Sequence, residues 1–495
     1  MAVKLEKLLL PSVPEIKSLE QEALVRLAIE MRERIEYYQG ILFRVQKKQF
    51  GRSSERSPKD NPADSPKEPA PRGETTKKLS ERYPDAPIQV NNIGFDQEPC
   101  CPECGKIMQD SGMTEDSEYL TVVPKQFIVI RQVRQKSRCD RCHSSIVTAP
   151  NPKRIIPKGS YSDEMIVDAT LSKYCDLSPM ERYCQMAARS GLLGLPPHSL
   201  IVASMKLAKF LCKIYSRIRA ETLNTKLLRS DETSHKMLEG DPKKNWFLWA
   251  FSSKIACFFE CHDTRSGDVS TSVLKDSICE FLLSDVYSGY SKSLTIVNKE
   301  RVKNNQTVIL AAYCNAHARR YFKDRDSDEV CEDAESMVAQ YKEIYELNKQ
   351  AKNQSPEVVL ELRSKMKPLF EAMKQEALLK IKTYSNKSQI YKAYYYFIEN
   401  YDGLTRFLDN HFIEIDNNFS ERLLRNHVIG RKTWYGTHSK RAAETAAIHF
   451  SIVETCKMNR VNPREFYLDA VNRIHTDQTQ LTPYEYKQLQ DSNTC

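Results

Sequence analysis

The stretch Leu227-Leu228-Arg229-Ser230-Asp231-Glu232-Thr233 decides the fold class of this 495-residue chain. Its apolar start predicts a short buried strand that runs into Asp231, and the patterning changes here from helical to strand-like. Residues from about 325 to 410 return to helical spacing, which predicts a helical insertion in a strand-based domain. Further strand-like runs occur at Trp246–Ser252, Ile255–Cys261, Phe281–Ser284 and Thr307–Tyr313.

Three acidic residues lie at the ends of such elements. Asp231 and Asp285 each follow an apolar run, and Glu421 follows the helix-start signal Asp416-Asn417. If the fold brings these carboxylates together, their oxygens suit a pair of hard divalent cations. The alternative for each acid taken alone is a turn residue or a helix cap.

Basic residues surround the last of these acids. The chain carries 74 Lys and Arg against 65 Asp and Glu, a net charge of +9, which permits a polyanionic partner without requiring one. A helix that carries Glu421 among cations suits a DNA backbone, and an ordinary solvated helix face is the alternative. The candidate phosphate contacts are Arg422, Arg425, Arg431 and Lys432.

Two C-x-x-C pairs predict a metal site. Cys101 with Cys104 and Cys139 with Cys142 supply four soft ligands, which suit tetrahedral zinc, against the alternatives of free thiols or a redox pair. Cys314-Asn315-Ala316-His317 has the spacing of half a metal site, but the sequence shows no second half. A histidine that merely lines a site is the alternative there.

The remaining segments complete a multidomain α+β organisation. Residues 16–50 predict a coiled-coil helix, 51–90 a proline-rich disordered linker, and 91–150 a zinc-binding ribbon. Within this ribbon, the β-branched and aromatic residues of Leu120–Val133 predict a strand, which Pro124 would break. Residues 151–225 are helical, with a pattern that fits either a DNA-binding helix-turn-helix or a plain helical hairpin. A strand-based domain at 226–450 and a helical tail at 451–495 follow. We expect neither a secretory signal nor a membrane span.

The order of these motifs resembles the IS66 family of bacterial insertion-sequence transposases over nearly the whole chain. The resemblance is carried by Gln49–Glu55, Cys101–Cys142, Ser230–Thr233, Asp285 with Tyr287–Tyr290, Cys314 with His317–Arg320, Ile415–Arg422 and Gly430–Lys432. Val286 departs from the glycine usual in that family.

The resemblance implies an RNase H-like catalytic domain with the DDE triad Asp231, Asp285 and Glu421. It further implies Mg²⁺ or Mn²⁺ at the triad, structural Zn²⁺ at the cysteine pairs, and metal-dependent cleavage and transfer of DNA strands at element ends. The expected partners are double-stranded terminal-repeat and target DNA, a second copy bound through the N-terminal helix, and accessory proteins of the same element. The expected location is the bacterial cytoplasm, at the nucleoid. The alternative is a regulatory DNA-binding protein that keeps the fold without the chemistry.

Overall fold

The computed structural model describes residues 20–32, 34–35, 78–84, 86–93, 97, 99–108, 116–123, 125–141, 146–238, 245–323 and 332–492. The chain divides into two units, residues 52–129 and residues 1–51 with 130–495. Its architecture is mixed α+β, as the sequence predicts. None of the helices in these stretches combines the length and apolarity that a membrane span requires.

A five-stranded mixed sheet lies at the centre of the larger unit, with the strand order β5-β4-β3-β6-β7. β3 pairs antiparallel with β4 and β4 with β5, whereas β6 runs parallel to both β3 and β7. The strands are β3 (Leu227–Lys236), β4 (Asn245–Ser252), β5 (Cys257–His262), β6 (Phe281–Ser284) and β7 (Leu310–Tyr313).

The expectation that the first strand ends at Asp231 is wrong, because β3 continues to Lys236. The residues from Glu232 to Lys236 pair with the first half of β4, so backbone hydrogen bonds extend the strand beyond its apolar run. Asp231 therefore lies within a strand, where its direction is set by the alternation of the pleat.

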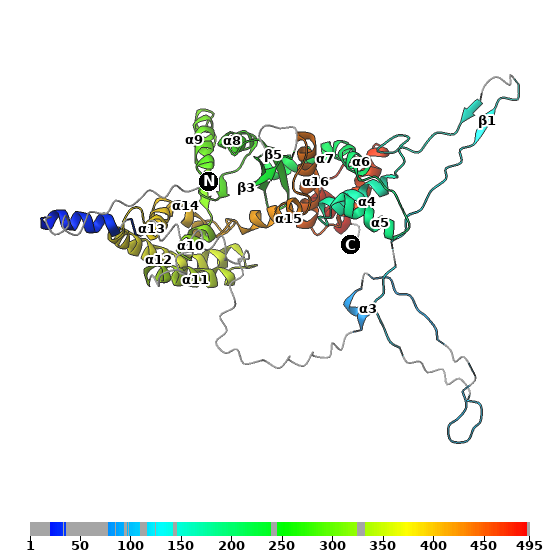
Figure 1. The fold of residues 1–495 in the computed structure, drawn as a ribbon, viewed down its shortest axis with the longest axis horizontal. Coiled ribbons are helices and arrows are strands. Elements are labelled where there is room, and N and C mark those ends of the chain that lie inside the picture. Colours follow the sequence, from blue (N-terminus) through cyan, green and yellow to red (C-terminus); the bar gives the residue numbers. More distant parts are fainter. Residues whose placement is uncertain are drawn as a thin grey trace. The chain divides into compact units, whose positions relative to one another are not determined.

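Each face of the sheet is covered by its own core. Leu228 and Leu282 contribute to one core with helices α8 (Gly267–Asp276) and α9 (Ser288–Lys303). Their strand neighbours Leu227 and Leu283 contribute to a second core on the opposite face. That second core is built with the helical insertion, whose helices gather beside the sheet (Figure 1).

Helices follow β7 up to α15, and those after Lys323 lie within the predicted insertion at about 325–410. Its buried aromatic side chains recur at helical spacing, so the helices pack on one another and on β7. The elements are α10 (Asn315–Lys323), α11 (Glu332–Gln350), α12 (Pro356–Lys380), η1 (Ile381–Thr383), α13 (Gln389–Glu399), α14 (Tyr401–Thr405) and η2 (Arg406–Asp409).

The edge of β5 is covered by a long helix rather than left open. Ser451 Oγ accepts from the Phe259 backbone N–H at 2.9 Å, and Thr455 Oγ1 accepts from that of Cys257 at 3.2 Å. These side chains satisfy edge donors that would otherwise invite another strand. Helices on this side of the sheet (Figure 1) include α4 (Asp163–Tyr174), α5 (Met180–Arg189), α6 (Pro197–Phe210), α7 (Cys212–Leu223), α16 (Lys440–Met458), α17 (Pro463–His475) and α18 (Pro483–Ser492).

The N-terminal third has little regular structure within its described residues. Residues 21–32 are helical, and the rest of the predicted coiled coil apart from residues 34–35 lies outside the described residues, as does linker segment 51–77. The strand expected at Leu120–Val133 is absent among its described residues, because β-branched side chains need a neighbouring strand. The elements here are α3 (Leu79–Arg82) and the antiparallel pair β1 (Lys136–Arg138) and β2 (Ile146–Thr148).

Candidate active site

Asp231 and Glu232 point to opposite faces of the sheet, because neighbours in a strand alternate. In the register with β4, Asp231 lies opposite Ala250 and Glu232 lies opposite Trp249. Ala250 belongs to the core that contains the buried leucines of α15 (Asn418–Trp434), whereas Trp249 packs edge-on against Tyr290 of α9. Asp231 therefore faces α15, and Glu232 faces α9.

Asp285 comes directly after β6, as predicted. β6 runs parallel to β3 with Leu283 beside Arg229, and the same register continued by two residues brings Asp285 level with Asp231. The backbone N–H of Tyr287 donates to Asp285 Oδ1 at 3.2 Å, which holds the carboxylate in the turn between β6 and α9.

Glu421 lies in the first turn of α15, and the turn before this helix is bound to β3. The Asn417 side-chain amide donates to the Ser230 carbonyl at 2.9 Å, while Ser420 Oγ donates to Asn417 Oδ1 at 2.8 Å. These bonds hold the start of α15 against the strand residue that precedes Asp231. Glu421 Oε1 is buried and accepts no hydrogen bond.

The charges of these acids act on one another. Burial, followed by the negative charges of Glu232 and Asp285, raises the pKa of Asp231 well above its usual range, and Glu421 adds to the effect. The Glu232 backbone N–H, which donates to Asp231 Oδ1 at 2.9 Å, opposes it. Carboxylates from β3, the end of β6 and α15 thus repel one another electrostatically, and a bound divalent cation would reduce this repulsion.

Glu232 has a different environment, which the sequence analysis missed. Its side chain is 2% exposed, accepts a 2.5 Å hydrogen bond from Tyr290 Oη, and forms a 2.6 Å ion pair with Arg265. Burial raises the pKa of Glu232, and these two partners oppose that rise. The sequence feature that could have indicated this environment of Glu232 is Tyr290, which comes three residues after Tyr287 on the helix that follows Asp285.

The predicted phosphate-binding residues of α15 divide into two groups. Arg422, Arg425 and Lys432 are exposed. Arg431 instead donates to both the backbone carbonyl and the hydroxyl of Ser234 on β3, and burial lowers its pKa. Only the first group presents its charge freely to solvent.

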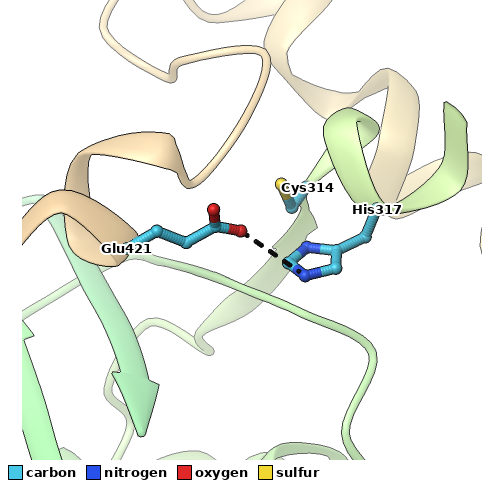
Figure 2. Close-up of side chains that lie close together, drawn as sticks. All are labelled: Cys314, His317 and Glu421. Carbon is cyan, nitrogen blue, oxygen red and sulfur yellow. Dashed lines mark ion pairs between the residues drawn. The ribbon is translucent and has the colours of Figure 1, made fainter. Parts of the chain in front are cut away.

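Cys314 and His317 lie beside Glu421 (Figure 2). Cys314 precedes α10, His317 follows one turn later, and His317 Nε2 is 3.5 Å from Glu421 Oε1. Burial raises the pKa of the Cys314 thiol to about 12, against the effect of nearby backbone N–H groups. Glu421, about 100 residues further along the chain, therefore places a third potential metal ligand beside this pair.

Cys101 and Cys104 lie in a tight turn of the smaller unit. The Cys101 backbone N–H donates to the Lys106 carbonyl at 2.8 Å, and Gly105, with a positive φ of 71°, donates to the Cys101 carbonyl. Backbone N–H groups of Cys104 and Glu103 lower the pKa of Cys101, which favours the thiolate that a metal needs. Cys139 is exposed after β1, and Cys142 lies outside the described residues.

Comparison with known families identifies both the region that contains the three acids and the region that contains the cysteine pairs. Residues 158–445 match the model of the transposase IS66 family, and residues 98–143 match that of the zinc-finger binding domain of the IS66 transposase. The chain belongs to the IS66 transposase family. The resemblance predicted from its motifs is confirmed, and the second match supports Zn²⁺ as the metal of the cysteine-pair region.

Relatives of this IS66 transposase family member include proteins of Sinorhizobium fredii. The uncharacterized protein y4hP is 24% identical over 433 residues, which cover 82% of this chain and 76% of that protein. The uncharacterized protein y4jD is 26% identical over 397 residues, which cover 78% and 76%. The family match indicates a transposase role and, with the zinc-finger region, a protein that binds DNA.

Proposed function

We propose that this IS66-family transposase cleaves and transfers DNA strands at the ends of an insertion sequence, as a DDE enzyme that uses Asp231, Asp285 and Glu421. The observation that carries the proposal is the convergence of these acids: the β3–β6 register brings Asp285 level with Asp231, and the Asn417–Ser230 hydrogen bond holds the start of the Glu421 helix against β3. Perturbed carboxylates from distant segments are characteristic of functional sites.

An RNase H-like arrangement of the catalytic domain is part of the proposal. It is supported by the strand order β5-β4-β3-β6-β7, in which three antiparallel strands join two further parallel ones. Asp231 is on the central strand, Asp285 is at the end of its parallel neighbour, and Glu421 is on a helix after an insertion. We assign this domain to residues 226–450, with the insertion at about 325–410.

The donor set fits Mg²⁺ or Mn²⁺. Asp231, Asp285 and Glu421 offer carboxylate oxygens, the ligands that hard cations prefer, and Glu421 Oε1 is buried without a hydrogen-bond donor. When bound, such ions activate a water or a 3′-hydroxyl and stabilise the leaving oxygen in phosphoryl transfer.

The chain's own cations would bind the DNA backbone beside these acids. Arg425 and Lys432 follow Glu421 by four and eleven residues, so they lie on its side of α15, and Arg422 is exposed next to it. Arg431 fixes α15 to β3 through Ser234 and so positions the helix that carries Glu421. Phosphate contacts of this kind set the register of the duplex without reading its sequence.

The other segments would serve recognition and assembly. Cys101, Cys104, Cys139 and Cys142 would hold structural Zn²⁺ within residues 91–150. With the helices of 151–225, that region would recognise the terminal repeats. The predicted coiled-coil helix of residues 16–50, whose described residues include the exposed Leu24 and Ile35, would join two copies, since transposition unites two element ends. Residues 51–90 would form the linker and 451–495 the helical tail, and accessory proteins of the element would complete the assembly.

A strand-transfer assay on terminal-repeat DNA tests the proposal. We expect activity that requires Mg²⁺ or Mn²⁺ and is lost in Asp285→Asn and in Glu421→Gln. Glu361→Gln on α12, whose side chain is 67% exposed, should retain activity as a matched control. Full activity in either acid variant would refute the assignment. DNA binding that is indifferent to divalent ions and to these substitutions, without any strand transfer, would instead favour a regulatory protein.

A further inference from the structure

Three side chains of different chemistry converge beside the proposed active site (Figure 2). Cys314 comes from the junction of β7 and α10, His317 from the first turn of α10, and Glu421 from α15. One ligand atom from each lies within 4.8 Å of the other two. Ligand atoms on one tetrahedral Zn²⁺ are roughly 3.3–3.7 Å apart, so rotations that move these atoms by roughly 1 Å would close the site.

The polar atoms of this cluster lack the partners that burial normally demands. Glu421 Oε1 and His317 Nδ1 are both buried and make no hydrogen bond. Because an unpaired buried polar atom costs about 1–3 kcal/mol, such atoms call for a ligand or a further partner. An ion pair between His317 and Glu421 would use Nε2 at 3.5 Å, which leaves Nδ1 unexplained.

The thiol of Cys314 is held as an acceptor. The Asn417 backbone N–H donates to Cys314 Sγ at 3.1 Å, and Asn417 is itself fixed to β3 through Ser230. The sulfur is fully buried and lies at the start of α10, where helix N–H groups favour negative charge. Backbone donors of this kind stabilise a thiolate once a metal replaces its proton.

We propose that Cys314, His317 and Glu421 form a binding site for a transition-metal ion of the Zn²⁺ class, separate from the C-x-x-C cysteines. One thiolate, one imidazole and one carboxylate form a ligand set that suits Zn²⁺ better than Mg²⁺, and three protein ligands leave a fourth position open.

The site shares Glu421 with the proposed catalytic acids. The effect of Zn²⁺ on strand transfer that follows from this sharing rests on the proposed function. A Glu421 carboxylate bound to Zn²⁺ beside Cys314 and His317 is withdrawn from Asp231 and Asp285. Zn²⁺ at this site therefore acts as an inhibitor of strand transfer and competes with the magnesium-dependent state.

Metal binding by the full-length chain tests the site directly, with Zn²⁺ and Co²⁺ as probes. We expect Cys314→Ser and His317→Ala each to bind one metal ion fewer than the unsubstituted protein. Cys314→Ser should also weaken the thiolate-to-Co²⁺ absorption. Cys279→Ser, which alters another fully buried cysteine, should leave the count unchanged. Equal metal counts in the unsubstituted protein and in folded His317→Ala would overturn the proposal, and circular dichroism establishes folding. His317 is partly exposed, so its variant remains informative if Cys314→Ser fails to fold.

A second experiment distinguishes failure of this metal site from failure of the proposed function. Asp231→Asn should lose strand transfer yet keep the Cys314-dependent thiolate-to-Co²⁺ absorption, because Asp231 is not a ligand of this site. If Asp231→Asn stays active while the count still falls in His317→Ala, the DDE assignment fails and the metal site stands. Zn²⁺ should inhibit the unsubstituted protein at concentrations at least tenfold below those that inhibit His317→Ala. Equal sensitivity would remove the inhibitory role.

Discussion

Asp231 and Glu232 are adjacent carboxylates of one strand, but the two faces of β3 give them opposite surroundings. On the face toward α9, Glu232 is paired with Arg265 and Tyr290. On the face toward α15, burial raises the pKa of Asp231, the charges of Glu232, Asp285 and Glu421 add to that rise, and the Glu232 backbone N–H opposes it.

The comparison teaches that burial alone does not mark a functional acid. Both side chains are buried deeply enough to raise their pKa values. The difference is that partners within the protein neutralise Glu232, whereas Asp231 is repelled by its neighbours. A buried acid with a cation of its own has its charge compensated within the fold, whereas a cluster of acids without one can bind a metal ion.

The largest expected effect comes from replacing each of the two adjacent acids, Asp231 and Glu232, by the corresponding amide. We expect Asp231→Asn to reduce strand transfer by about 10³-fold, because loss of a metal-binding carboxylate removes about 4 kcal/mol of transition-state stabilisation. Glu232→Gln keeps a group that Tyr290 and Arg265 can bind, so its loss should stay below about tenfold. Single-turnover transfer rates measure both. Equal losses in the two variants would break the distinction between the faces.

The next effect concerns the histidines that join β3 to α15 on the Asp231 face. His235 Nδ1 lies 3.2 Å from His427 Nε2, and burial, followed by the charge of Arg431, lowers the pKa of His235 to about 4. The unfolded chain takes up this proton near pH 6.5, before the folded chain does. Stability is therefore full above pH 6.5 and falls by about 3 kcal/mol as the pH drops toward 4.

Urea unfolding at pH 7.5 and at pH 5 measures about 2 kcal/mol of this loss, and the remainder follows below pH 5. His235→Asn should reduce the dependence between the two values without abolishing it, because burial also lowers the pKa values of His427 and His449. The control is His262→Gln, which alters a partly exposed histidine beside Glu260 and should leave the dependence intact. If His235→Asn retains the dependence of the unsubstituted protein, another group controls the acid stability of this face.

A third prediction concerns the ion pair on the α9 face. Arg265→Ala leaves the carboxylate of Glu232, which is 2% exposed, without its cation. We expect unfolding to become easier by about 2 kcal/mol, less than for a fully buried pair because Arg265 is 46% exposed. The double variant Arg265→Ala/Glu232→Gln should recover part of this loss. Calorimetric or urea midpoints decide, and an unchanged midpoint would mean that the pair does not stabilise the fold.

The smallest expected effect is a gain rather than a loss of stability against unfolding. Asp231→Asn removes one of the repelling charges, so the metal-free variant should unfold about 1 kcal/mol less readily than the unsubstituted protein. Added Mg²⁺ should raise the midpoint of the unsubstituted protein and leave that of the variant unchanged, because a ligand stabilises the state that binds it. A destabilised Asp231→Asn protein would show that this carboxylate supports the fold.

Much of the frame was predictable from local pattern. Apolar runs located β4, β6 and the helices of the insertion, and the position of Asp285 after β6 followed from its own segment. The length of β3 could not be predicted from local pattern, because the second half of this strand is polar and forms a strand only through its pairing with β4. The described residues of 120–133 form no strand, although a strand is expected there, because strand propensity without a pairing neighbour produces no strand.

The sequence by itself determined the family, the order of the elements and which residues can ionise or bind a metal, because these depend on residue type and local spacing. Only the tertiary structure decided that Asp231 faces acids while Glu232 faces Arg265, and that Cys314 and His317 meet Glu421. The physical reason is that electrostatic energy and metal ligation depend on distances in space. Those distances are set here by the register of β3 with β6, where Leu227 lies opposite Phe281, and by the contact of α15 with β3, where Asn417 bonds to Ser230 from 187 residues further along the chain.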